Sequence, residues 1–244
     1  MEPTRSFAYP LQRGPVCGSS GRLRELLCLF VGLLAVTAIS ACATSSPPVT
    51  VPPADQTAVA DHIQLGRAAL ESGQQAEAVQ ELEQAVALAP ESVEARFQLG
   101  NAYTEVEQFE KAVASFEKVV ELDPQHADGY SNLGVAYYRQ GQMSKAVEAF
   151  EEAVDLAPDD AEIRYNLGGA LAQLDRLDEA ITAFQEALSL DPNLPEAYLG
   201  LGSVYKLQSK NSEAIEALNR FLELSDDPQW RAYAQQLIAE LGAQ

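Results

Sequence analysis

The chain has 244 residues, of which 47% are hydrophobic and 21% charged, and its formal net charge at pH 7 is -20. This length and composition are sufficient for a sizeable hydrophobic core. The acidic balance argues against nucleic acid and anionic membrane surfaces as partners, because both carry the same sign of charge as the chain.

Residues 1–41 have the layout of a secretory signal peptide. Four arginines precede an uncharged apolar run at residues 26–39, which ends in small residues. A run of about fourteen residues is short for a bilayer core of about 30 Å, so the pattern favours a cleaved signal over an uncleaved membrane anchor. The long region before the run leaves open a translation start further downstream.

The end of the apolar run resembles the lipobox of bacterial lipoproteins. Ile39, Ser40 and Ala41 place one aliphatic and two small side chains before Cys42. A cysteine thiolate is a nucleophile suited to carrying a thioether-linked diacylglycerol. The resemblance implies that Cys42 is lipidated, with acyl chains such as palmitate that hold the protein stably on a membrane. The alternative is an ordinary signal peptide with a cysteine nearby by chance.

The residues around Cys42 also bear on location. Ala43 follows the cysteine where an aspartate would signal retention, so the lipoprotein resemblance implies the outer membrane of a double-membrane bacterium, facing the periplasm. All three cysteines lie at or before Cys42, so a chain cleaved there has neither a disulfide nor a cysteine catalyst. Residues 42–58 are rich in proline and small polar residues, which predicts an extended tether.

From residue 59 the chain repeats itself with a period of 34 residues. Each copy holds a Leu-Gly pair, an alanine twelve residues after the glycine, a bulky apolar residue four positions later, and a closing proline. The glycines are Gly66, Gly100, Gly134, Gly168 and Gly202; the alanines are Ala78, Ala112, Ala146, Ala180 and Ala214; the bulky residues are Leu82, Phe116, Phe150, Phe184 and Leu218; the prolines are Pro90, Pro124, Pro158 and Pro192, with the fifth displaced to Pro228. A period of this length is typical of a helix-turn-helix array.

The central copy, at residues 127–158, shows why these residue types recur. Gly134 and Ala146 lack bulk, so the two helices of the copy can approach closely, while Tyr137 and Phe150 fill the volume between them. Short amphipathic helices are marginal alone, so each copy needs a neighbour to pack against.

The pattern resembles the tetratricopeptide repeat family over residues 59–244. The resemblance predicts an all-α, right-handed α-solenoid of five repeats at residues 59–92, 93–126, 127–160, 161–194 and 195–228. A capping helix is expected at residues 229–244, where one apolar stripe is formed by Trp230, Tyr233, Leu237, Ile238 and Leu241.

In this family the first helix of each repeat lines a ligand groove. Carried onto this chain, the resemblance implies the groove residues Gln64, Arg67, Phe97, Gln98, Asn101, Ser131, Asn132, Tyr138, Arg139, Tyr165, Asn166 and Gln173. The recurrent amides Gln98, Asn132 and Asn166 are suited to hydrogen bonds with an extended peptide backbone. The aromatic residues Phe97, Tyr138 and Tyr165 are suited to apolar anchoring. The alternative is that the amides are general features of the repeat that face solvent.

Two further features bear on the ligand. The lysines that clamp an acidic C-terminus in chaperone-binding relatives are replaced here by Ile63, Phe97 and Ser131, so that mode of binding is not expected. Removal of residues 1–41, which carry four arginines and two glutamates and hence +2, takes the net charge from -20 to -22. A charge of this sign favours basic peptides or proteins as partners.

An acidic residue occupies one position in successive repeats, at Glu94, Asp128, Glu162 and Glu196. These residues fall in the first turn of the first helix, where the helix dipole stabilises a carboxylate, and this is the simpler interpretation. A column of carboxylates spaced by one repeat would also suit a basic, extended ligand.

The sequence offers no catalytic constellation. Zinc-protease, phosphate-loop, nucleophile-elbow and dinucleotide patterns are absent. The two histidines, His62 and His126, fall in distant elements, so we expect each to be solvated and neither to share a metal site. No metal, cofactor or enzymatic activity is therefore predicted.

The combined pattern indicates a membrane-anchored, extracytoplasmic adaptor or scaffold that binds proteins or peptides. Its layout is similar to that of bacterial repeat lipoproteins that assist pilus or secretion assembly or gather enzymes of the cell wall. The alternative is a self-associating structural lipoprotein, because repeat stacks can continue between chains and form a homo-oligomer. A hydrolase is the third class considered.

Overall fold

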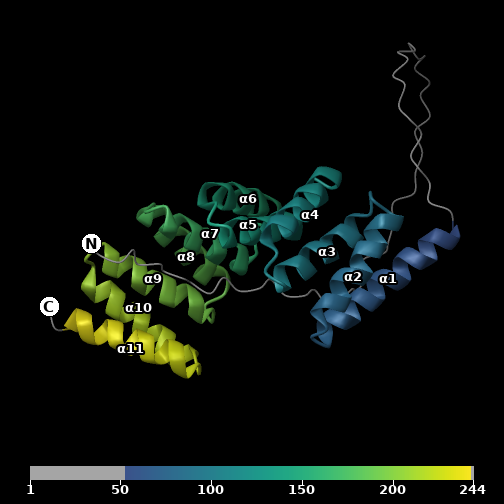
Figure 1. Ribbon diagram of the computed structural model, residues 1–244. Coiled ribbons are helices and arrows are strands. Elements are labelled where there is room, and N and C mark those ends of the chain that lie inside the picture. The colour runs from purple at the N-terminus through teal and green to yellow at the C-terminus, as the bar shows by residue number, and fades with distance from the viewer. Residues whose placement is uncertain (1–52, 243–244) are drawn as a thin grey trace, which may run out of the picture.

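The computed structural model describes residues 53–242, which form eleven α-helices joined by short turns, with no strand in that range (Figure 1). The first helices of the repeats are α1 (Pro53–Glu71), α3 (Val93–Glu105), α5 (Ala127–Arg139), α7 (Ala161–Gln173) and α9 (Pro195–Leu207). The second helices are α2 (Gln75–Leu88), α4 (Phe109–Leu122), α6 (Met143–Leu156), α8 (Leu177–Leu190) and α10 (Asn211–Leu224), and α11 (Pro228–Gly242) follows. The predicted all-α solenoid is confirmed.

The helices are arranged in two layers. Each first helix packs on the second helix of its own repeat and on the second helix of the preceding one. Successive first helices also contact each other, as α7 does with α9, whereas successive second helices make at most marginal contact in the described range. Because the first helices lie closer together, they line the inner, concave side of the stack, and the second helices form its convex side (Figure 1).

The small and large residues of the repeat nest as the sequence predicts. The five repeated alanines, among them Ala146, are fully buried, and Phe116, Phe150 and Phe184 are at most 1% exposed. A Cβ atom added at Gly134 would lie only 2.7 Å from the Phe150 ring, and Gly100 and Gly168 stand in the same relation to their own phenylalanines. The glycine is therefore required by the ring that packs on it.

The turn inside each repeat also follows a fixed pattern. Gly141, which separates α5 from α6, has a φ of 77°, in the left-handed region that favours glycine. The same turn position holds Glu107, Asp175 and Ser209 in other repeats, with φ between 58° and 61°. The second helices end just before the repeated prolines, which cannot continue a helical hydrogen-bond ladder.

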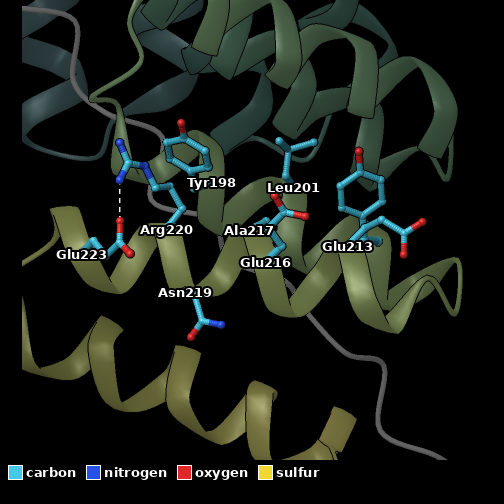
Figure 2. A pocket seen from close by; sticks show the side chains of 9 residues that line it. Tyr198, Leu201, Glu213, Glu216, Ala217, Asn219, Arg220 and Glu223 are labelled. Carbon is cyan, nitrogen blue, oxygen red and sulfur yellow. Dashed lines mark hydrogen bonds and ion pairs between the residues drawn. The ribbon is translucent and has the colours of Figure 1, made fainter.

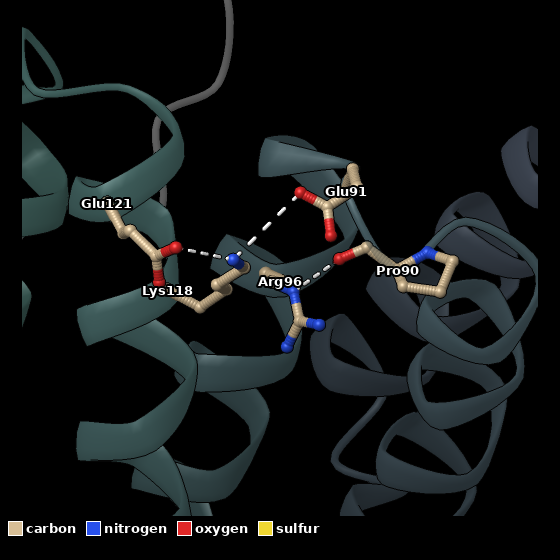
Figure 3. A network of polar contacts seen from close by, with 5 residues as sticks. All are labelled: Pro90, Glu91, Arg96, Lys118 and Glu121. Carbon is tan, nitrogen blue, oxygen red and sulfur yellow. Dashed lines mark hydrogen bonds and ion pairs between the residues drawn. The ribbon is translucent and has the colours of Figure 1, made fainter. Parts of the chain in front are cut away.

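The outer side of the stack is tied together by polar contacts. Tyr137 donates its hydroxyl proton to Glu117 of the preceding repeat, with 2.5 Å between the oxygens, and the Lys145 ammonium lies 5.1 Å from the tyrosine ring. At the junction of the first two repeats, Lys118 contacts Glu121 at 2.8 Å and Glu91 at 3.9 Å (Figure 3). Tyr137 thus links two repeats, and Lys118 contacts both its own helix and the turn before α3.

The two ends of the array differ from the sequence prediction. The sequence predicts an extended tether as far as residue 58, but α1 begins at Pro53. Proline is compatible with the first turn of a helix, where its missing N–H is not needed, so this proline opens a helix instead of marking an extended chain. Pro228 likewise opens α11 and does not close α10, which ends at Leu224.

Helix α11 caps the stack. Asp227 accepts hydrogen bonds from the backbone N–H groups of Gln229 and Trp230, at 2.8 and 3.1 Å. Leu237 and Leu241 are buried against α10, and Trp230 packs at the edge of the same cluster. None of the helices in residues 53–242 combines the length and hydropathy needed to cross a membrane.

Candidate protein-binding groove

The concave face carries a row of side chains from α1, α3, α5, α7 and α9, and most predicted groove residues lie on it. Gln64 and Arg139 are exposed, and Arg67, Asn101, Asn132 and Gln173 are partly buried. Phe97 is also partly buried, and the remaining predicted residues are buried. The structure gives these residues different roles.

One column of predicted groove residues belongs to the core instead. Tyr165 is 1% exposed and packs against Phe184 with 5.9 Å between ring centroids. Phe97 lies edge-on to Phe116 at 6.0 Å, and Ser131 is buried at the equivalent position. The interpretation of Tyr165 as a ligand anchor is therefore wrong, because its ring is buried against the second helix of the repeat. Phe97 is partly buried, and its role as an anchor stays a prediction.

The three recurrent amides, Gln98, Asn132 and Asn166, do not face open solvent, and two of them already have hydrogen-bond partners. Gln98 is buried and donates from Nε2 to Glu94 Oε1 at 2.9 Å. Asn132 donates from Nδ2 to Asn101 Oδ1 at 2.8 Å, across the junction between α3 and α5. Asn166 is 2% exposed, and its Oδ1 has no hydrogen-bond partner. The Gln98 amide is therefore bonded within α3, the Asn132 amide links α5 to α3, and Asn166 has an acceptor without a partner.

Tyr138 is the aromatic residue that remains on the inner face. Burial raises the pKa of its hydroxyl, while the Arg139 charge and a hydrogen bond with Gln173 oppose this shift. The contact joins α5 to α7, so three of the predicted groove residues meet at this junction. Tyr138 is 9% exposed, which limits it to an edge contact with a ligand.

The acidic column changes character along the stack. Glu94 and Asp128 are exposed, whereas Glu162 and Glu196 are partly buried. Burial raises the pKa of the Glu162 carboxyl, and the neighbouring charges of Asp160, Glu196 and Asp191 raise it further. The dipole at the start of α7 does not prevent this, because Asp160 already occupies the N-cap and accepts from the N–H groups of Glu162 and Ile163.

Both histidines have structural partners, so the prediction that they are solvated is wrong. His126 caps α5 by accepting from the Gly129 N–H at 3.0 Å, and its ring stacks on Phe97 with 4.9 Å between centroids. His62 Nδ1 lies 2.7 Å from Glu81 Oε2. In the part of the chain that the structure describes, no three histidine, cysteine or acidic side chains converge as metal ligands.

A hollow lies between α9 and α10. It measures about 620 Å³ and is lined by aromatic and acidic side chains that include Tyr198, Tyr205 and Glu216 (Figure 2). Its one arginine, Arg220, is bound to Glu223 on the same helix, and Gln185 of α8 donates to the Tyr205 hydroxyl at 3.0 Å. The sequence did not predict this hollow, because its walls come from two helices and the distance between them is known only from the structure.

The lipidation site predicted at Cys42, the signal peptide at residues 1–41 and the tether as far as residue 52 lie outside the described residues. The sequence reasoning also missed Asp160 and Asp191, which surround Glu162. Asp160 could have been found, because it occupies the cap position held by Ser92 and His126 in earlier repeats.

Known repeat families match most of the chain. Family models described as tetratricopeptide repeats match residues 132–195 and 171–241, and one described as a TPR repeat matches residues 66–106 and 100–141. Together these matches run from residue 66 to residue 241. No curated protein sequence matched the chain.

Solved structures share the fold. MamA (residues 41 to the end) from Desulfovibrio magneticus RS-1 is 26% identical, with a TM-score of 0.65, and the match covers 70% of this chain and 98% of that one. YrrB, described as a TPR protein with an unusual peptide-binding site, is 23% identical, with a TM-score of 0.62 and coverage of 75% and 98%. PilF of Pseudomonas aeruginosa is 21% identical, with a TM-score of 0.64 and coverage of 78% and 91%.

The likeness to YrrB and PilF shows the fold alone. The family matches, the 34-residue period and the nested glycine and phenylalanine pairs agree with one another. The chain belongs to the tetratricopeptide repeat family, whose solenoids serve in protein interaction.

Proposed function

We propose that this protein is a non-catalytic adaptor that binds protein partners through its concave face and is held on the bacterial cell envelope by a lipid. The observation that supports the adaptor role is the inner surface itself. Four first helices, α1, α3, α5 and α7, present a row of amide, charged and hydroxyl groups from Gln64 on α1 to Gln173 on α7. An extended segment of a partner can follow such a row from repeat to repeat.

Site-specific photocrosslinking tests the adaptor role. A photoreactive residue replaces Arg139, which is exposed on the concave side, in the full chain expressed in a double-membrane bacterium. We expect a discrete crosslinked partner that is absent when the same residue replaces Asp155, which is exposed on the outer helix α6. Equal crosslinking from the two positions, or crosslinking from Asp155 alone, would place partner binding elsewhere.

The proposed anchor rests on the sequence. Ile39, Ser40 and Ala41 precede Cys42 in the lipobox arrangement, and the apolar run before them is of signal-peptide length. Two or three acyl chains bind a membrane stably because each buried methylene contributes about 0.8 kcal/mol. We place the protein at the outer membrane facing the periplasm, in an assembly process such as pilus, secretion or cell-wall construction.

Replacement of Cys42 by alanine is expected to abolish the incorporation of radioactive palmitate and to release the protein from the membrane fraction. Cys28→Ala is the matched control, because Cys28 lies within the apolar run that cleavage removes. Labelling that persists in Cys42→Ala would refute the lipobox interpretation. The readout is autoradiography of the immunoprecipitated protein.

Self-association is the alternative proposal, and one observation favours it. Leu65 on α1 is 56% exposed, whereas Leu99 and Leu133, at the same position of the next two repeats, are 6% and 5% exposed. The preceding repeat covers the later leucines, so the first repeat presents an end that a second copy could cover.

A further inference from the structure

Three acceptor groups gather on the concave face where the fourth and fifth repeats meet. We call them the acceptor cluster: the Glu162 and Asn166 side chains of α7 and the Glu196 side chain of α9. Glu162 and Asn166 are one helical turn apart on the same face of α7. The charges of Glu162 and Glu196 interact across the α7–α9 junction.

Asn166 lacks the hydrogen bond to the preceding repeat that Asn132, at the equivalent position, makes. In the preceding repeat, Asn132 donates to Asn101, which lies 31 residues upstream. The residue 31 positions before Asn166 is Val135, which has no polar side chain. That lost bond would engage the Nδ2 donor; separately, the Asn166 side chain is 2% exposed and its Oδ1 acceptor has no hydrogen-bond partner. A buried acceptor without a partner is costly, and such groups in native proteins are commonly satisfied by a ligand or by water.

The two glutamates of the cluster are also unpaired. Within residues 53–242, neither the Glu162 nor the Glu196 side chain takes part in an ion pair or a hydrogen bond, and Glu196 Oε2 is buried. Two further acids stand beside them, but Asp160 is occupied with the α7 cap and Asp191 with the Asn193 N–H. The cluster therefore consists of unused acceptors in a negative field.

The chemistry of the cluster selects a class of ligand. Ionised carboxylates and an amide oxygen accept hydrogen bonds and donate none, so the complementary group is a positively charged donor. A metal ion does not fit, because no three acidic or histidine side chains in the described residues converge. A guanidinium or ammonium group reaches acceptors that are spread over two helices, since it carries several N–H donors.

We propose that the acceptor cluster is a subsite for an arginine or lysine side chain of the partner segment that lies along the concave face. This inference rests on the adaptor function proposed above and gives it a specificity: a basic residue seated over the junction of α7 and α9. The bound cation neutralises the repulsion between Glu162 and Glu196 and supplies a donor to Asn166. Burial and the repulsion from neighbouring acids raise the pKa of Glu162 in the unbound protein. The ionised carboxylate is therefore already destabilised before the ligand binds, and a cation would relieve that repulsion.

The test uses two short peptides of glycine and serine, acetylated and amidated at their ends, with one central arginine or with its neutral isostere citrulline. Their affinities for the full chain are measured by fluorescence anisotropy at low salt. We expect binding of the arginine peptide only, and a loss of about tenfold or more in the double variant Glu162→Gln with Glu196→Gln. Asn166→Leu, which removes the amide acceptor, is expected to weaken binding severalfold without a change in net charge.

A matched double variant separates a local site from the general charge of the protein. Glu94→Gln with Asp128→Asn removes two charges from the same column in the second and third repeats, so it lowers the long-range potential equally. We expect this variant to keep its affinity within about twofold. Equal losses in the two double variants, equal binding of the citrulline peptide, or no arginine-dependent binding would each overturn the subsite. Thermal unfolding confirms that the variants remain folded.

The outcome is distinguishable from that of the adaptor proposal. If crosslinking from Arg139 still captures a discrete partner while the arginine peptide shows no preference, the groove binds proteins and only the subsite is wrong. If crosslinking from the concave face fails, the adaptor proposal falls whatever the peptide does.

Discussion

Replacing Phe150 with alanine is expected to lower the free energy of unfolding by about 3–5 kcal/mol. Phe150 is fully buried on α6, in the middle repeat, and its ring lies against Gly134 of α5. The truncation removes the apolar surface of the ring and leaves a cavity that the rigid helix pair cannot close completely. Because each repeat is stabilised by its neighbours, damage in the middle repeat weakens the junctions on both sides. Denaturant unfolding followed by circular dichroism measures the loss.

Phe109→Ala is the matched control for this prediction. Phe109 is the first residue of α4 and is only partly buried, so the same change of residue type removes less buried surface and leaves no closed cavity. We expect the control to cost clearly less than Phe150→Ala. The opposite order would show that the two halves of the repeat are packed in a different register.

The fold could be predicted from the sequence because its determinants recur at short range. The pair formed by Gly134 and Phe150 lies within one repeat, and its copies at Gly100 and Gly168 fix the same geometry. The predicted repeat starts at residues 93, 127, 161 and 195 are the first residues of α3, α5, α7 and α9. A contact that is repeated at a constant spacing leaves little freedom for an alternative arrangement of the helices.

The site was predicted less well because its determinants are not periodic. Tyr165 and Asn166 are adjacent in sequence, yet the tyrosine ring is part of the core and the amide belongs to the inner face. Asn132 donates to Asn101 in the preceding repeat, but Val135 stands where Asn166 would need the equivalent acceptor for its Nδ2 group. Such a departure between repeats becomes visible only when the contacts of each repeat are compared.

The second large effect is expected from Gly134→Ala, and it should depend on Phe150. A methyl group at Gly134 would lie 2.7 Å from the Phe150 ring, so either the ring or the helices must move. Overpacking of this kind costs roughly 1–3 kcal/mol. When Phe150 is already alanine, the clash is absent, and Gly134→Ala gains about 1 kcal/mol of helix propensity instead. The double-mutant cycle should therefore give a coupling energy of about 2 kcal/mol or more.

Gly141→Ala supplies the comparison that makes this coupling specific. Gly141 also occurs in the central repeat, but no atom lies within 4 Å of its missing Cβ, and its φ of 77° makes an alanine costly through the backbone alone. That cost does not involve the Phe150 ring, so it should be the same, within about 0.5 kcal/mol, with either residue at position 150. The two coupling energies are then compared. If the Gly134–Phe150 coupling is no larger than the Gly141–Phe150 coupling, the ring does not limit the close approach of α5 and α6. The explanation of the repeat by packing of the glycine against the ring would then be wrong.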